Sequence, residues 1–565
     1  MFWVRGHTGS AVGLDRHMNS RAALVAACFA LLACLWVDRA SAQTPNEDAP
    51  STWGSGRPED TTADPPKADD DDDSEEDRDD EDDQLDDTES PPGGAGRKSE
   101  PRSDFEDQSL RYTLEAVEIR GNTRTRDRVV LRYVPFHVGD VLDVEDPAIE
   151  LTRYRLLGTG FFRDVQFSLR KGNAGGKVIL VIEVVERNTF VVNDLWMGLS
   201  KDADNDGTPK PLTPYAGLDA AETNLAGTGI LLGGAVGLAS SQLALRVRFL
   251  DPAFLGSTWM TGGELLFNDA RDFFGNSDVR YVAPAQDTER VTEHATVQYK
   301  RFGGALGVGR DLSISTQLWL HYRLESIDAT PPDAASHVRG ETREPIDFDI
   351  IRGPSVLSTL RASLEHDTRD QPVLPSHGWF LQAMTEVSLT PAGSDYPYER
   401  VELKLSKWWE LPWDHVISLS LFGGAISGDA PFFEQYYVGD FSDFLPARVL
   451  GLNFDRRPPP NLLGTAIQEV RYGRYAGRIG TEYRIPLYRG SRSVYGIDFF
   501  ASAGVYAVAN PVDFERPASG YSGLARAPID VTGNLGFRID TSAGGFAFAF
   551  SNALGFIPPI QGENP

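Results

Sequence analysis

The sequence repeats a short pattern in which apolar residues alternate with charged or small ones. The segment LALRVRF (243–249) has leucine, valine or phenylalanine at every odd position and arginine at positions 246 and 248. Because successive side chains of a β-strand point to opposite faces, one face of this strand is apolar and the other is basic. The same alternation occurs in VELKLSK (401–407), VISLSLF (416–422), RIGTEYRIPL (478–487) and GFAFAF (545–550).

The region 189–565 reads as strands separated by turns such as AGTG (226–229), PSHG (375–378) and LPWD (411–414). At about 10 residues for each tilted strand, plus connections, its length accommodates about 16 strands, with short turns at one end and long loops at the other. We therefore expect an outer-membrane β-barrel, whose closure pairs the backbone and leaves the charged face in a wet lumen. A large secreted β-sandwich is the alternative, because alternation does not distinguish lipid from a protein core.

Residues 1–42 are typical of a secretory signal peptide. Basic residues precede an apolar run over 22–37, and small residues up to Ala42 supply a cleavage site. The run is shorter than the ~20 residues that a membrane-spanning helix needs, although such an anchor is the alternative. Both cysteines of the chain, Cys28 and Cys34, lie in this segment, so we expect no disulfide after cleavage.

The net charge of −28 comes mainly from residues 43–108, which hold 25 acidic and 6 basic residues. We expect this segment to be a disordered linker, because like charges repel and little apolar surface is available for burial. A linker that steers basic clients is an alternative to a simple spacer. The acidic balance argues against binding of nucleic acid.

Residues 109–188 read as a small α+β domain with the order strand, helix, helix, strand, strand. A helix is expected from about 147 to 157, and the last two strands form a hairpin around 173–176. The strand over 162–169 is expected to lie at an exposed edge, where extended peptides add a strand. The expected client-binding edge comprises Phe162, Val165, Phe167 and Leu169.

The chain shows no motif of catalysis. It contains no Walker loop, HExxH or GxSxG motif, so nothing indicates an enzyme, a cofactor or a metal centre. The segment DADNDG (202–207) resembles the start of an EF-hand loop, but its twelfth position is Thr213 rather than glutamate. We interpret it as a loop outside the membrane, with a weak calcium site as the alternative.

Several segments occur together in a characteristic order. In the α+β domain they are VEIRGN (117–122), LLGTGFFRDVQFSL (156–169) and VILVIEVVER (178–187). In the strand region they are ETNLAGTG (222–229), RFLDPAFLG (248–256), DTRDQPVLPSHGW (367–379) and GNLGFRIDTSAGGFAFAFSNALGF (533–556). They resemble the BamA/TamA outer-membrane assembly superfamily. The resemblance implies one POTRA domain (109–188) followed by a transmembrane antiparallel barrel (189–565).

One feature of that superfamily is altered. The resemblance implies that a long sixth loop folds into the barrel with a V-R-G-F or V-R-G-Y motif whose arginine pairs with acids on the wall. Here VLGL occupies 449–452, so Leu450 stands where arginine is expected. The resemblance places the wall acids at Glu482 and Asp498. The expected lock therefore comprises Arg448, Gly451, Glu482 and Asp498, with Arg456 or Arg457 as alternatives to Arg448, and a simply hydrated Asp498 as the alternative to a lock.

The resemblance also implies a function. The POTRA domain captures unfolded outer-membrane or secreted polypeptides and passes them to the barrel in the outer membrane of a Gram-negative bacterium. The POTRA domain and acidic linker then lie in the periplasm, where accessory proteins bind. Insertion uses a seam between the first strand (about 190–199) and the last (about 546–556), lined by Phe546, Phe548, Phe550 and Phe556; outward conduction through the lumen is the second route. A dedicated two-partner-secretion transporter and a passive structural barrel are the alternative functions.

Overall fold

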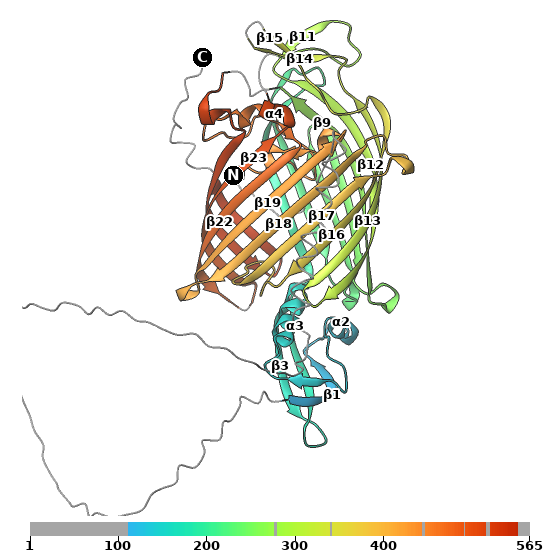
Figure 1. The fold of residues 1–565 in the computed structure, drawn as a ribbon, viewed down its shortest axis with the longest axis vertical. Coiled ribbons are helices and arrows are strands. Elements are labelled where there is room, and N and C mark those ends of the chain that lie inside the picture. Colours follow the sequence, from blue (N-terminus) through green and yellow to red (C-terminus); the bar gives the residue numbers. More distant parts are fainter. Residues whose placement is uncertain are drawn as a thin grey trace, which may run out of the picture. The chain divides into compact units, whose positions relative to one another are not determined.

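The computed structural model describes residues 111–275, 279–339, 342–442, 447–490, 492–515 and 520–551. The expected signal peptide and acidic linker lie outside these residues, as does Phe556. No helix within the described part is both long and apolar enough to cross a membrane. A small α+β domain is followed by a large antiparallel sheet that forms most of the molecule (Figure 1).

The α+β domain is a four-stranded sheet in the order β2-β1-β4-β3, covered by two helices. β1 and β4 pair in parallel, and the other neighbours are antiparallel. Helix α3 starts at Pro147, and the Asp146 side chain caps it by accepting a hydrogen bond from the Ala148 amide. The elements are β1 (Arg111–Arg120), α2 (Asp127–Leu131), β2 (Val141–Asp143), α3 (Pro147–Gly158), β3 (Phe162–Lys171) and β4 (Lys177–Glu186).

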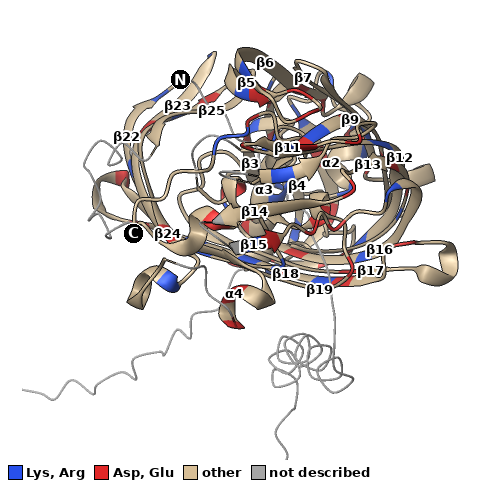
Figure 2. Cartoon of the chain, turned by 90° about the horizontal axis from the view of Figure 1, so that it is seen from above, with Lys and Arg blue, Asp and Glu red and all other residues tan. Residues whose placement is uncertain are grey.

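The large sheet has 15 described strands, close to the expected number of about 16, and all neighbours are antiparallel. Seen end-on, the strands curl into a ring (Figure 2). The strands are β5 (Phe190–Ala203), β6 (Pro209–Glu222), β7 (Leu231–Ala239), β8 (Gln242–Asp251), β9 (Trp259–Phe274), β12 (Ala295–Ser313), β13 (Thr316–Thr330), β16 (Gly353–Asp367), β17 (Gly378–Ser388), β18 (Tyr398–Glu410), β19 (Val416–Gly428), β22 (Tyr475–Arg489), β23 (Val494–Ala509), β24 (Ile529–Thr541) and β25 (Gly544–Ser551).

The two ends of the barrel differ. Short turns and the α+β domain occupy one end, here called the domain end, and long connections occupy the other, the loop end (Figure 1). Connections at the loop end form a second sheet in the order β11-β10-β14-β15. Its strands are β10 (Val279–Val282), β11 (Glu289–Thr292), β14 (Ala335–Arg339) and β15 (Thr342–Pro345), and α4 (Pro511–Glu515) lies in a further loop.

The alternation read from the sequence sorts side chains between the two faces of the wall. On β8, Leu245, Val247 and Phe249 are exposed on the outside. Arg246 instead pairs with Glu264 of the adjacent β9, and Arg248 pairs with Asp219 of β6, two strands away. The partners of the basic face in LALRVRF are therefore mainly acids on the same wall.

The sequence led us to expect a wet lumen, but part of the lumen is packed with apolar side chains. Aromatic side chains of the wall and of the loop 429–474 form one packed core toward the loop end. This core includes Tyr299 stacked on Phe433 at a ring separation of 5.4 Å, and Phe274 edge-on to Phe432 at 5.1 Å. The loop therefore fills this part of the barrel with apolar side chains.

Candidate functional site: the seam, the inner loop and the domain junction

The first and last described strands of the sheet meet at a seam. Fifteen antiparallel strands make fourteen reversals of direction, so β5 and β25 run the same way. No backbone ladder joins β5 to β25 within the described residues. The Val192 amide donates to the carbonyl of Ala543, in the turn before β25, at 2.8 Å. Above this contact the two strands present backbone edges that are not paired with each other.

Two residues before β5 fasten the seam at the domain end. Arg187 Nη2 lies 3.1 Å from Asp540 Oδ1 and 3.0 Å from the carbonyl oxygen of Thr541. The neighbouring Asn188 side chain donates to the Ser542 carbonyl at 2.8 Å. The side chains of Arg187 and Asp540 are only 8% and 9% exposed. The seam is thus fixed where the α+β domain enters the barrel.

The predicted seam residues that the structure describes lie on β25, which pairs with β24. Phe548 is opposite Phe537, and Phe550 is opposite Leu535. Phe550, Phe537 and Leu535 are exposed on the outer face. These rings form part of the apolar exterior, and the edge available at the seam is the backbone of β25.

The structure corrects the expected loop lock. Arg448 pairs with Asp440 of the same loop, with Nη2 2.6 Å from Oδ2. Asp498 is paired instead with wall arginines, at 2.5 Å from Arg489 and 3.7 Å from Arg484. The remaining predicted residues also pair elsewhere: Glu482 with Arg538, Arg456 with Glu293 and Arg457 with Asp455. The wall acids are neutralised by arginines of β22 and β24, whose register the motif does not reveal.

The tip of the loop rests on a different part of the wall. Val449 and Leu452 form an isolated bridge, and the two residues between them have positive φ, 50° at Leu450 and 80° at Gly451. Arg246 Nη2 of β8 donates to the Leu450 carbonyl at 3.1 Å. A Cβ atom added to Gly237 of β7 would lie 3.3 Å from Val449. The tip is therefore seated against β7 and β8, close to the seam in strand order.

The loop is anchored to the inner face of the barrel wall by an acidic side chain, Glu434. Glu434 Oε1 lies 3.0 Å from Arg301 of β12 and also contacts Arg323 of β13. Glu325 bridges the same two arginines, at 2.8 Å from Arg301 and 2.5 Å from Arg323. Because Glu434 is buried, these partners are needed to compensate its charge. The charges are thus reversed from the expected lock: here the loop supplies the acid and the wall supplies the arginines.

The charged network continues along the wall. Glu386 of β17 lies 2.5 Å from Arg361 and 3.5 Å from Arg400, and accepts a hydrogen bond from the Tyr398 hydroxyl at 2.9 Å. Sequence reasoning missed these residues. Their signal was the inward position of Arg323 and Glu325 in the alternating segment HYRLES (321–326).

β3 is the edge strand of the α+β domain, as expected. However, Phe162 and Val165 are buried in the core of the domain, at 2% and 0% exposure, and Phe167 packs against that core. Leu169 is exposed. The edge therefore offers mainly backbone groups, and Arg153 Nε of α3 already donates to the Val165 carbonyl at 2.9 Å.

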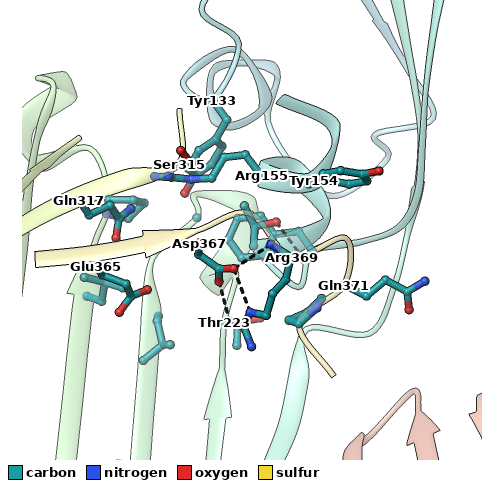
Figure 3. A pocket seen from close by; sticks show the side chains of 18 residues that line it. Tyr133, Tyr154, Arg155, Thr223, Ser315, Gln317, Glu365, Asp367, Arg369 and Gln371 are labelled. Atoms are coloured by element: carbon teal, nitrogen blue, oxygen red, sulfur yellow. Dashed lines mark hydrogen bonds and ion pairs between the residues drawn. The ribbon is translucent and has the colours of Figure 1, made fainter. Parts of the chain in front are cut away.

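The domain is joined to the domain end of the barrel by polar contacts. Arg132 and Arg155 converge on Asp311 of β12, at 3.1 Å and 2.5 Å. The Tyr154 hydroxyl lies 2.8 Å from His377 Nε2, just before β17. Tyr154 and Arg155 also line a cavity of about 270 Å³, together with Gln317, Glu365, Asp367 and Arg369 (Figure 3).

A second contact joins the domain to the first turn at this end. The Asn224 side chain donates to the Thr125 hydroxyl at 2.9 Å, and the Arg126 amide donates to the Gly227 carbonyl at 3.0 Å. Gly227 has φ of 71°, and a Cβ there would lie against the Arg124 carbonyl oxygen, so the close approach requires glycine.

Glu186 organises the same loop from the domain side. Its carboxylate accepts hydrogen bonds from the amides of Thr123, Arg124 and Thr125. Burial acts to raise the pKa of Glu186, but these hydrogen bonds outweigh it and hold the pKa below its ordinary value.

The acidic side chains of the EF-hand-like segment (202–207) form ion pairs with basic side chains. Asp202 lies 3.2 Å from Arg271, Asp204 lies 2.8 Å from Lys210, and Asp206 lies 2.5 Å from Arg290. No group of three or more potential metal ligands occurs among the residues that the structure describes.

Together these features define the class: a β-barrel with an apolar exterior, a folded-in loop and an α+β domain at one mouth. The model for the Omp85 superfamily domain matches residues 224–554, and that for the POTRA domain, the surface antigen variable number repeat, matches 112–187. The chain belongs to the Omp85 superfamily, which confirms the resemblance seen in the sequence. It is accordingly an outer-membrane protein of the Gram-negative type.

One curated protein and two solved structures are similar to this chain. The outer membrane protein assembly factor BamA of Nitratidesulfovibrio vulgaris is 25% identical over 336 residues, which cover 58% of this chain and 36% of the relative. The solved structure of BamA from Haemophilus ducreyi lacking POTRA domains 1–3 covers 78% of this chain and 81% of its own, with 16% identity and a TM-score of 0.42. CdiB from Escherichia coli covers 79% and 74%, with 10% identity and a TM-score of 0.44.

Proposed function

We propose that this chain inserts client polypeptides into the outer membrane at the seam between β5 and β25. The observation that carries the proposal is the direction of these strands. Because they run the same way, one strand placed between them and antiparallel to both would continue the alternation of the whole sheet. An extended segment of a client has this geometry and can add to the facing edges of β5 and β25, which no backbone ladder joins within the described residues.

The POTRA domain, which we place in the periplasm, supplies the first contact with the client. Its edge strand β3 offers backbone groups for strand addition. The ion pairs of Arg132 and Arg155 with Asp311 hold the domain at the mouth of the barrel. A client bound to β3 is thereby kept near the seam, which raises its local concentration there.

The packed lumen favours insertion over outward conduction. Loop residues Phe432, Phe433 and Tyr437 lie in the core that fills the barrel toward the loop end. An unfolded client crossing by this route would have to displace that core, whereas entry at the seam leaves it in place.

The test uses the full chain in phospholipid vesicles, with Cys28 and Cys34 replaced by serine. Cysteines are introduced at Val192 and Ala543, which lie together because the Val192 amide donates to the Ala543 carbonyl at 2.8 Å. A short bis-maleimide then joins the strands. We expect the unlinked protein to accelerate folding of a urea-denatured outer-membrane protein, followed by its heat-modifiable migration, and the linked protein to lose that acceleration.

Equal acceleration by linked and unlinked protein would overturn insertion at the seam. Transfer of the client across the vesicle membrane without its folding would indicate secretion instead. In cells, depletion of the chain should lower the levels of other outer-membrane proteins, and unchanged levels would favour a passive barrel.

A further inference from the structure

The outer face of the barrel carries a lysine between two tryptophans. Lys407 lies near the end of β18 and is opposite Trp379 of β17. Its Nζ atom is 4.6 Å from the centre of the Trp379 ring and 5.9 Å from that of Trp409. Both rings are exposed, and cation–π attraction to them holds the ammonium between the rings.

The position of Lys407 along the barrel is fixed by its neighbours. Gly378 pairs with Trp408, and His377 beside it contacts Tyr154 of the POTRA domain. Lys407 is therefore at the domain end, where tryptophans of an outer-membrane barrel meet the lipid headgroups. Along the same outer face, Leu419 is opposite Lys407 and Ile417 is opposite Trp409, so apolar surface for acyl chains adjoins the ammonium.

The ammonium has no carboxylate partner within ion-pair distance among the described residues. Lys300 provides the contrast. It lies on the outer face of β12, where Lys300 is opposite Asp269 and their side chains pair at 3.0 Å. A cation at the edge of the hydrocarbon needs an anion, and at Lys407 the neighbouring protein supplies only aromatic rings.

A similar arrangement occurs elsewhere on this rim. Arg310, near the end of β12, lies over the Trp259 ring at 5.5 Å. It too has no carboxylate within ion-pair distance in the described part of the chain. Two separate cations of the outer face thus rest on tryptophan at the same end of the barrel.

We propose that Lys407, bracketed by Trp379 and Trp409, binds the phosphate of an anionic phospholipid in the leaflet that surrounds the domain end. The ammonium pairs with the phosphate, the indoles fix it at headgroup depth, and the acyl chains lie along the apolar strands. The apolar surface beside the ammonium selects a lipid over free inorganic phosphate.

The test is native mass spectrometry of the full chain, released from micelles that contain phosphatidylglycerol or phosphatidylcholine. Wild type should retain phosphatidylglycerol in preference to phosphatidylcholine. Lys407→Gln should reduce that retention about fivefold, the value for loss of one basic residue near an anionic surface. Lys300→Gln is the matched control and should retain the lipid as wild type does, and Lys407→Arg should restore most of the binding. Heat-modifiable migration verifies that each variant is folded.

Undiminished retention in Lys407→Gln would overturn the proposal, as would equal retention of the two lipids. Displacement of phosphatidylglycerol by inorganic phosphate would show that the site takes the free anion rather than the lipid. Each of these results leaves the seam assay unaffected, so failure here is distinct from failure of the proposed function.

Discussion

Arg187 and Asp540 join the two sides of the barrel seam. The arginine precedes the first strand, the aspartate lies on the last strand but one, and their side chains meet at 3.1 Å while almost fully buried. Removing one partner leaves an uncompensated buried charge, which costs about 3 kcal/mol or more. This pair is therefore the strongest identified restraint on the seam in the described part of the molecule.

Arg187→Ala should lower the free energy of unfolding by about 3 kcal/mol, because Asp540 loses its partner in a buried site. The measurement is urea unfolding of the protein in vesicles. Arg120→Ala is the control, since Arg120 and its partners Glu118 and Glu183 lie at the surface, and it should change stability by less than about 1 kcal/mol. An equal loss of unfolding free energy in the two variants would show that the buried seam pair stabilises the protein no more than an exposed pair does.

Glu434→Gln should release the inner loop. The substitution leaves Arg301 and Arg323 with one acid fewer in a buried network, at a cost of about 3 kcal/mol. Limited proteolysis should then cleave the loop 429–474 faster than in wild type. Asp333→Asn, at an exposed position of another loop, should leave the cleavage rate unchanged. Protection as strong as in wild type would contradict an anchoring role for Glu434.

Two glycines of β7 test the seat of the loop tip. Gly237→Leu should displace the tip, because a Cβ there already lies 3.3 Å from Val449 and 3.5 Å from Leu450. Overpacking of this kind costs about 1–3 kcal/mol. Gly234→Leu on the outer face of the strand should be tolerated, because a Cβ there meets only the Arg246 carbonyl oxygen, at an ordinary contact distance of 3.8 Å. A nitroxide on residue 450 would report the displacement as increased mobility, and identical spectra for the two variants would refute the seat.

Glu186→Gln should loosen the loop that joins the POTRA domain to the barrel. Because the folded-state pKa of Glu186 is lowered, its stabilisation is present above the ordinary carboxyl pKa and is lost as pH falls through the folded value. Hydrogen exchange of residues 123–126 should be faster in the variant at neutral pH, by an amount worth about 1 kcal/mol, and the difference should vanish in acid. Glu183→Gln is the exposed control, and a difference that persists in acid would contradict this role.

The strands could be predicted because their determinant is local. In LALRVRF (243–249), a period of two is sufficient to assign the outer face and the inner face. The partner of Arg448 could not be predicted, because it depends on how a long loop folds relative to strands far away in sequence. The motif around Asp498 indicated an acid facing the lumen. Its partners Arg484 and Arg489 could not be predicted, because their proximity depends on the register between β22 and β23.

The POTRA domain shows the same division. The edge position of β3 follows from the order of the elements, whereas the burial of Phe162 and Val165 depends on which face the helices cover. Alternation defines two faces of a strand without saying which one the rest of the fold will occupy. The Glu434 network was missed for a related reason, since its acid and its arginines are more than a hundred residues apart.

The aromatic plug contributed by the sixth loop also has an electrical consequence. A hollow cylinder of this circumference would pass ions and metabolites freely, as porins do. Because rings such as Phe433 and Tyr437 pack inside the barrel, we expect the protein to pass far fewer ions than an open barrel, even though no backbone ladder joins β5 to β25 among the described residues.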